Sequence, residues 1–224
     1  MHIGLIGGIG PAATDLYYRG LIDTMKARGK ALDLTIVHAD APTLIRNFEA
    51  RQPDVQAKIF LRLADRLVDA GAEAIAITSI GGHFCIEQFR AHSPLPIIDL
   101  IEELDRCLEE KGFRTVGLLG TDTAMETRFY GGVKSVEILI PDSSEITKIH
   151  RNYVDMALSA KVTDVQRQVF FDAGQALAKR GAEVVLLGGT DLFLAFDGET
   201  PGFETLDCAQ VHIEAIAREA SREN

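Results

Sequence analysis

Short apolar segments alternate along the chain with longer amphipathic ones. The short segments are rich in Ile, Leu and Val, which is typical of buried strands. Strands are predicted at residues 2–6, 34–38, 74–78, 96–99, 115–119, 135–140 and 183–187. Helices are predicted at residues 11–26, 55–70, 100–111, 164–180 and 208–220, with another helix starting within 125–130. Strands that alternate with helices predict an α/β fold with mainly parallel sheets and helices covering their faces.

The pattern restarts near the middle of the chain. Ile-Gly-Leu-Ile-Gly-Gly at residues 3–8 resembles Val-Gly-Leu-Leu-Gly-Thr at residues 116–121, an offset of 113. Gly-Ala-Glu-Ala-Ile-Ala at residues 71–76 resembles Gly-Ala-Glu-Val-Val-Leu at residues 181–186, an offset of 110. Two matches at nearly one spacing indicate an internal duplication. We therefore expect two pseudo-symmetric three-layer α/β lobes.

Four loops follow predicted strands and are the candidate ligand-binding positions. They are residues 7–11, 79–83, 121–125 and 188–191. Ligands of parallel α/β sheets bind beyond the carboxyl ends of the strands. If the halves face each other, a substrate between them has one reacting group on each side, which suits moving a proton between two faces of one carbon.

Composition and charge exclude several classes of protein. The formal net charge of -10 argues against a nucleic-acid surface. No apolar stretch is long enough for a membrane span and no leader pattern is seen, so we expect a cytoplasmic protein. The cysteines Cys85, Cys107 and Cys208 are interpreted as small buried hydrophobes of a reducing compartment, and no metal site is predicted.

The first loop also fits a dinucleotide fingerprint, but only weakly. Gly8, Gly10 and Ala13 match its small-residue spacing. The acidic residue expected about 20 positions later is absent, and Pro11 removes a backbone donor. A nicotinamide cofactor is therefore disfavoured.

Four further motifs are informative, namely Gly-Gly-Ile-Gly-Pro-Ala-Ala-Thr at residues 7–14, Gly-Thr-Asp-Thr-Ala-Met-Glu at 120–126, Phe-Tyr at 129–130 and Ile-Pro-Asp at 140–142. Together they resemble the aspartate/glutamate racemase family, in particular its broad-specificity amino-acid racemase branch. The resemblance spans nearly the whole chain. It implies a first lobe of residues 1–98 plus 206–224, a second lobe of 99–205, and an active-site cleft between them. It also implies a homodimer and catalysis without a cofactor.

Both positions that carry the family's reactive cysteines differ here. Ser79 stands where the family has Pro-Cys-Asn-Thr-Ala-His, since this chain reads Thr-Ser-Ile-Gly-Gly-His at residues 78–83. Gly189 stands where the family has Gly-Cys-Thr-Glu, since this chain reads Gly-Gly-Thr-Asp at residues 188–191. A serine becomes a useful base only with a partner that removes its proton. We therefore predict Ser79, His83 and Asp191 as the catalytic residues, with His83 either that partner or the base itself.

Each of these residues also has a structural interpretation. Ser79 can cap the following helix, His83 can satisfy a buried hydrogen bond, and Asp191 can be a helix N-terminal charge.

Substrate-binding residues are predicted from their positions on the loops. Thr121, Thr123 and Thr190 lie on turns whose N–H groups suit a carboxylate. Asp40 suits a substrate ammonium group, and Arg46, with Arg51 nearby, suits a second substrate carboxylate. The simpler interpretations are that Asp40 is a turn residue and that both arginines are solvated. The other loop residues predicted to line the site are Gly8, Ile80, Gly81, Met125 and Gly189.

The sequence thus predicts a cofactor-independent racemase or isomerase of an amino acid or related small carboxylate. Two alternatives remain open. One is an inactive homologue that binds an amino acid or dicarboxylate, and the other is a one-base lyase or decarboxylase.

Overall fold

The chain forms two compact units. The computed structural model describes residues 1–222. One unit comprises residues 1–100 and the C-terminal segment from residue 212, and the other comprises residues 101–211. Among the described residues, strands in both units pair only in parallel, which confirms the predicted α/β class.

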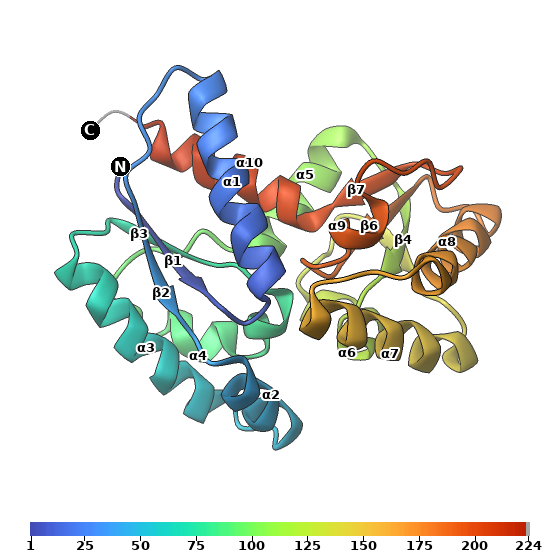
Figure 1. Cartoon of the computed structure of the whole chain (residues 1–224), viewed down its shortest axis with the longest axis horizontal. Coiled ribbons are helices and arrows are strands. Elements are labelled where there is room, and N and C mark those ends of the chain that lie inside the picture. Colours follow the sequence, from blue (N-terminus) through green and yellow to red (C-terminus); the bar gives the residue numbers. More distant parts are fainter. Residues whose placement is uncertain (223–224) are drawn as a thin grey trace. The chain divides into compact units, whose positions relative to one another are not determined.

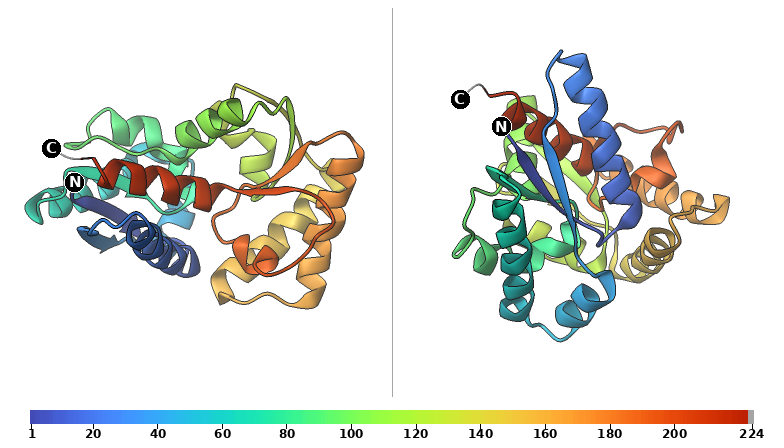
Figure 2. Two further views of the ribbon diagram at one scale, coloured as in Figure 1. Left: turned by 90° about the horizontal axis from the view of Figure 1, so that it is seen from above. Right: turned by 60° about the vertical axis from the view of Figure 1, so that its left-hand side comes forward.

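The first unit contains a three-stranded sheet in the order β2-β1-β3. Its strands are β1 (Ile3–Gly7), β2 (Leu34–His38) and β3 (Ala74–Ile77). Its helices are α1 (Pro11–Ala27), α2 (Ala41–Glu49), α3 (Pro53–Asp69), the 3-10 helix η1 (Ile80–Cys85), α4 (Ile86–Arg90) and most of α10 (Cys208–Ala220). Helix α3 packs on one face of the sheet, and α1 and α10 lie on the other (Figure 1 and Figure 2).

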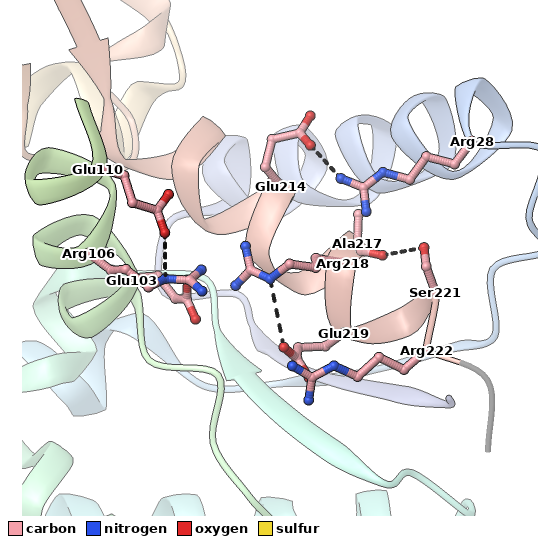
Figure 3. Close-up of polar contacts among 10 residues, drawn as sticks. All are labelled: Arg28, Glu103, Arg106, Glu110, Glu214, Ala217, Arg218, Glu219, Ser221 and Arg222. Atoms are coloured by element: carbon pink, nitrogen blue, oxygen red, sulfur yellow. Dashed lines mark hydrogen bonds and ion pairs between the residues drawn. The ribbon is translucent and has the colours of Figure 1, made fainter.

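The C-terminal helix α10 is attached to the first unit by apolar packing and by ion pairs. Ile213 and Ile216 are fully buried. At the surface, Arg28 pairs with Glu214 at 2.7 Å, as Figure 3 shows. Because exposed ion pairs contribute little, the buried isoleucines supply most of the stabilisation.

The second unit contains a four-stranded sheet in the order β5-β4-β6-β7. Its strands are β4 (Thr115–Leu119), β5 (Glu137–Leu139), β6 (Val184–Leu187) and β7 (Thr205–Asp207). Its helices are α5 (Leu100–Lys111), α6 (Asp122–Glu126), the 3-10 helix η2 (Phe129–Gly131), α7 (Ser143–Ser159), α8 (Asp164–Lys179) and α9 (Phe193–Phe196). Helix α8 packs against β4 and β6, and α7 packs beside α8.

One packing contact recurs in both units and supports the internal duplication. A Cβ added at Gly4 of β1 would lie 2.8 Å from Leu67 of α3. A Cβ added at Gly117 of β4 would lie 3.0 Å from Leu177 of α8. In each unit a glycine in the central strand therefore lets a leucine of the covering helix approach the backbone.

Some predicted elements differ from the structure. Residues 96–99 form no strand but a single bridge between Ile75 and Ile97, because Pro96 has no N–H to donate and α5 begins soon afterwards. The strand predicted at 135–140 is shortened to β5. Helices α2 and α7 and strand β7 were not predicted. Within residues 1–222, no helix combines the length and apolar character that a bilayer crossing requires.

Candidate functional site

The loop after β3 presents Ser79 at the start of η1. The residue is 7% exposed and has an extended backbone. Its hydroxyl makes no capping hydrogen bond to η1, so the interpretation of Ser79 as a helix cap is wrong. A Cβ added at Gly81 would lie 3.5 Å from the Ser79 Oγ, which places these two residues side by side. Ile80, between them, is fully buried.

His83 contacts the backbone of Ser79 instead of its hydroxyl. The His83 Nδ1 lies 2.8 Å from the Ser79 carbonyl oxygen. A carbonyl can only accept, so Nδ1 carries the proton and donates it. The Nε2 atom lies 3.9 Å from Asp99, whose other carboxylate oxygen accepts from Arg90 at 2.5 Å. In this structure His83 therefore fixes the course of the loop and does not withdraw the Ser79 proton.

A second buried histidine lies in the same unit. His212 donates from Nε2 to the Ile98 carbonyl at 2.8 Å, so its Nδ1 accepts from the Tyr17 hydroxyl at 2.9 Å. Burial lowers the pKa of His212 to about 4. It is therefore neutral at physiological pH and holds the segment that leads into Asp99.

The loop after β1 contains Gly8, which was predicted to line the site, and uses its backbone N–H internally. Gly8 has a φ of +94°, and a Cβ there would lie 2.2 Å from the His38 ring, so only glycine fits. The Gly8 N–H donates to the Thr14 hydroxyl at 2.8 Å. The Thr14 hydroxyl also lies 3.2 Å from the Thr78 hydroxyl, and this hydrogen bond links the loop to the residue that follows β3.

Asp40 and Arg46 belong to a capping network at the start of α2. Asp40 accepts from the Thr43 N–H at 2.9 Å and from its hydroxyl, and these bonds lower the pKa of Asp40. Arg46 donates to the Thr43 hydroxyl at 2.8 Å. Both residues are exposed. The structural role of Asp40 as a helix cap is thus established, and a ligand role for either residue stays a prediction.

In the second unit, backbone donors of the loop after β4 already have partners within the protein. The Thr121 hydroxyl accepts from the Ala124 N–H at 3.1 Å, and the Asp122 carboxylate accepts from the Thr123 N–H at 2.6 Å. Met125 is fully buried. The Asp122 carboxylate already accepts the Thr123 N–H at this turn. A substrate carboxylate would therefore have to displace it in order to bind there.

The loop after β6 contains Gly189, Thr190 and Asp191, all enclosed. Thr190 is fully buried and Asp191 is 3% exposed. The Thr190 hydroxyl is the only buried side-chain polar atom without a hydrogen-bond partner among residues 1–222. An unpaired buried hydroxyl costs stability, so its retention marks this loop as a candidate functional position.

Tyr153 of α7 fills the space where a side chain at position 189 would lie. A Cβ added at Gly189 would be 2.3 Å from the Tyr153 ring and 2.9 Å from its hydroxyl. The hydroxyl donates to Asp191 Oδ2 at 3.3 Å. Burial, and next the Asp191 charge, raise the pKa of Tyr153 well above its ordinary value, so the phenol keeps its proton.

Two further ionisable residues lie where β7 leads into α10. Asp207 accepts from the Ala209 N–H at 2.8 Å, yet burial of its carboxyl raises the pKa to about 6, although the residue as a whole is half-buried. Burial likewise raises the pKa of the neighbouring Cys208 thiol, which therefore stays protonated. Charge interactions with Asp191 contribute to the shifts of both Tyr153 and Cys208, which indicates that the three residues are neighbours.

The sequence analysis missed Tyr153, Asp207 and the partners of His83. Tyr153 had a usable signal, because Ile146, Ile149, Tyr153 and Met156 have helical spacing and are buried on one face of α7. Within the described chain, no group of three or more His, Cys, Asp or Glu residues is arranged to hold a metal ion.

Known structures have the same fold over essentially the whole chain. A candidate Asp/Glu racemase from Yersinia pestis matches with a TM-score of 0.87 at 23% identity, covering 99% of this chain and 100% of that one. An aspartate racemase homologue from Pyrococcus horikoshii matches with a TM-score of 0.80 at 24% identity, covering 99% of both chains. The aspartate racemase of Picrophilus torridus matches with a TM-score of 0.78 at 18% identity, covering 100% of this chain and 96% of that one.

The sequence itself matches a family model. Residues 6–216 fit the model described as Asp/Glu/Hydantoin racemase, a span that includes the loops after β1, β3, β4 and β6. The resemblance expected from the motifs is thereby confirmed, and the chain belongs to the Asp/Glu/Hydantoin racemase family.

Proposed function

We propose that this protein is a cofactor-independent racemase or isomerase that moves the α-proton of an amino acid or related small carboxylate. The observation that carries the proposal is the Asp191 carboxylate, which is 3% exposed and hydrogen-bonded on a strand-end loop of a racemase-family fold. Asp191 is the proposed base because a carboxylate can accept a proton without prior activation, whereas the Nε2 of His83 faces the Asp99 carboxylate at 3.9 Å.

Ser79 is the proposed proton donor. A hydroxyl is a poor base without a partner, but it can protonate a strongly basic carbanion. Its hydroxyl makes no cap to η1 and is thus available for this role. His83 is assigned the support of the Ser79 backbone, because its Nδ1 donates to the Ser79 carbonyl.

The proposed reaction balances in protons. Asp191 takes the α-proton as the C–H bond breaks, and the electron pair stays on the α-carbon, delocalised into the substrate carboxyl. The Ser79 hydroxyl then supplies the proton of the new C–H bond. The serine alkoxide regains a proton from water, and Asp191 releases its proton to water. Because enantiomers are equally stable, kcat/KM is the same in both directions, and the different basicity of the two groups can appear only in kcat and KM taken separately.

The proposal is tested by α-hydrogen exchange. Single enantiomers of an amino-acid panel that includes both dicarboxylic members are incubated with the protein in deuterated water. Loss of the α-proton is followed by NMR and inversion by chiral chromatography. Asp191→Asn is expected to lose at least about 100-fold in the rates of both exchange and inversion, and Ser79→Ala at least about 100-fold in the rate of inversion, as for removal of a proton-transfer group. Asp65→Asn, at an exposed position of α3, is the matched control and should keep the wild-type rate.

A second candidate function is carboxylate binding without turnover. The filling of the space beside Gly189 by Tyr153 favours it, because no reactive side chain can stand at that position. This candidate predicts a higher melting temperature with an amino acid or dicarboxylate and no exchange of its α-hydrogen. Exchange with any member of the panel excludes this second candidate. If no member of the panel undergoes exchange and none raises the melting temperature, both candidates are excluded.

A further inference from the structure

The second unit combines an unusual backbone position with an unusual side-chain contact. Gly189 lies at the carboxyl end of β6, where a side chain would point at the Tyr153 ring with its Cβ 2.3 Å away. Contacts below 3.0 Å do not occur between real Cβ atoms and their neighbours, so glycine at 189 and tyrosine at 153 depend on each other. The two residues come from different elements, the β6 loop and helix α7.

The hydroxyl of Tyr153 ends beside the same loop. It lies 2.9 Å from the Cβ position of residue 189 and donates a hydrogen bond to Asp191 Oδ2 at 3.3 Å. Tyr153 is 6% exposed and Asp191 3%, so the bond is enclosed. A hydrogen bond to a charged group in such surroundings is worth more than one at the surface.

We propose that Tyr153 is a positioning residue for Asp191. Its ring occupies the volume left by the missing side chain at 189, and its hydroxyl orients the Asp191 carboxylate and stabilises its charged form. Helix α7 thus supplies to the loop what the loop itself lacks. The inference rests on the proposed function for its catalytic meaning, but the coupling between the two side chains does not depend on it.

Simple filling of space by Tyr153 is the competing explanation. It requires the ring alone, so Tyr153→Phe should then behave as the wild type in every respect except a small loss of stability. Positioning requires the hydroxyl, and therefore predicts that the effect of Tyr153→Phe depends on the charge of residue 191. Tyr17→Phe is a matched control, since Tyr17 also buries a hydroxyl that donates to one side chain, His212, in the other unit.

The first measurement is a double-mutant cycle on folding. Tyr153→Phe is made in the wild type and in Asp191→Asn, and unfolding is followed with denaturant at pH 7. Positioning predicts that the effect of Tyr153→Phe on the unfolding equilibrium constant is about 10-fold larger in the wild type than in Asp191→Asn. Tyr17→Phe should show the same effect in both backgrounds. Equal effects of Tyr153→Phe in both backgrounds overturn the proposal, whether or not the protein is an enzyme.

The second measurement is the rate of α-hydrogen exchange as a function of pH. If the wild type exchanges the α-hydrogen of a substrate, Tyr153→Phe should lower kcat about 10-fold or more with little change in KM. It should also move the acid limb of the pH–rate profile to higher pH. Tyr17→Phe should leave the limb in place. An unchanged profile with an active wild type refutes positioning but leaves the proposed function standing. No exchange by the wild type, together with a coupled cycle, refutes the function and keeps Tyr153 as the group that orients Asp191.

Discussion

The loops after β3 and β6 are equivalent in the duplicated pattern but are built in different ways. After β3, the candidate reactive group Ser79 belongs to the loop, and His83 supports it from within the same segment through the backbone. After β6, Gly189 has no side chain, and Tyr153 reaches in from α7 to the Asp191 carboxylate. One scaffold therefore supports a chemical group either from within the loop or from a neighbouring helix.

The difference has a consequence for substitution. A loop that supplies its own reactive group can exchange one small side chain for another without changing its surroundings. A loop whose free space is filled from another helix cannot regain a side chain unless that helix changes too. The second loop should therefore be the harder one to alter, and the following substitutions test this asymmetry.

Gly189→Cys should have the largest effect. The new Cβ would overlap the Tyr153 ring, so we expect a loss of at least about 3 kcal/mol in the free energy of unfolding. Adding Tyr153→Ala should recover part of that loss, since it removes the overlap. Gly81→Ala is the comparison in the first unit and should cost less than about 1 kcal/mol, because its nearest neighbour is the Ser79 Oγ at an ordinary 3.5 Å.

Denaturant unfolding of the four proteins measures these differences. Additive effects of Gly189→Cys and Tyr153→Ala, or equal losses at positions 81 and 189, would show that Tyr153 does not fill the space of the missing side chain.

His212→Gln should expose a pH dependence of the first unit. The folded pKa of His212, about 4, lies below its ordinary value of 6.5, so the folded state binds this proton less tightly. The stability due to neutral His212 is therefore complete above pH 6.5 and is lost as the pH falls toward 4. We expect His212→Gln to be less stable than the wild type by about 2 kcal/mol at pH 7, and this gap to close toward pH 4.

Unfolding curves between pH 4 and 8 measure the gap. A gap that is constant over this range would mean that His212 is stabilising by shape alone, without a neutral imidazole held between Tyr17 and Ile98.

Asp207→Asn, in the second unit, should reveal a stability that depends on pH in the opposite direction to that of His212. The folded pKa of Asp207, about 6, lies above its ordinary value of 3.8, so the folded state binds this proton more tightly. The stability due to the protonated acid is complete below pH 3.8 and is lost as the pH rises through 6. The neutral amide keeps an oxygen that can accept from the Ala209 N–H. Between pH 4 and 7, the free energy of unfolding of Asp207→Asn should therefore rise relative to that of the wild type by about 1 to 2 kcal/mol.

The same pH series on this variant provides the measurement. A difference that does not grow with pH would indicate that the Asp207 carboxyl is solvated and titrates normally.

Local pattern was sufficient for most of the fold. Residues 34–38, 100–111, 115–119 and 208–220 were predicted with the bounds of β2, α5, β4 and α10, because each is a regular apolar or amphipathic run with a clear boundary. Residues 96–99 failed because a strand is made by its partners, and Pro96 limits the pairing there to one bridge.

The candidate site was predictable only as far as the loops that carry it. The strand-end rule gives the positions of Ser79 and Asp191 along the chain, since it depends on topology. Tyr153 is 36 residues from Gly189, and their mutual dependence arises from side-chain packing between two elements. A single sequence holds no record of such a contact. In the same way, burial shifts the pKa values of Asp207 and His212, and this burial arises from packing in the folded chain.

Ser79→Ala should have the smallest effect on folding. The Ser79 hydroxyl makes no cap to η1, and the backbone contacts of this loop, Gly82 N–H and His83 Nδ1 to the Ser79 carbonyl, do not involve its side chain. We therefore expect the free energy of unfolding to change by less than about 0.5 kcal/mol. Asp191→Asn, by contrast, should change stability measurably, because it alters a buried bond to Tyr153.

The contrast becomes sharp when stability and inversion are measured on the same preparations. A Ser79→Ala protein that is as stable as the wild type but no longer inverts the substrate would separate chemistry from folding in the first unit, where the reactive group belongs to the loop. In the second unit the two properties should change together, because Asp191 and Tyr153 serve both. A Ser79→Ala protein that loses stability as Asp191→Asn does would mean that the two loops are built alike after all.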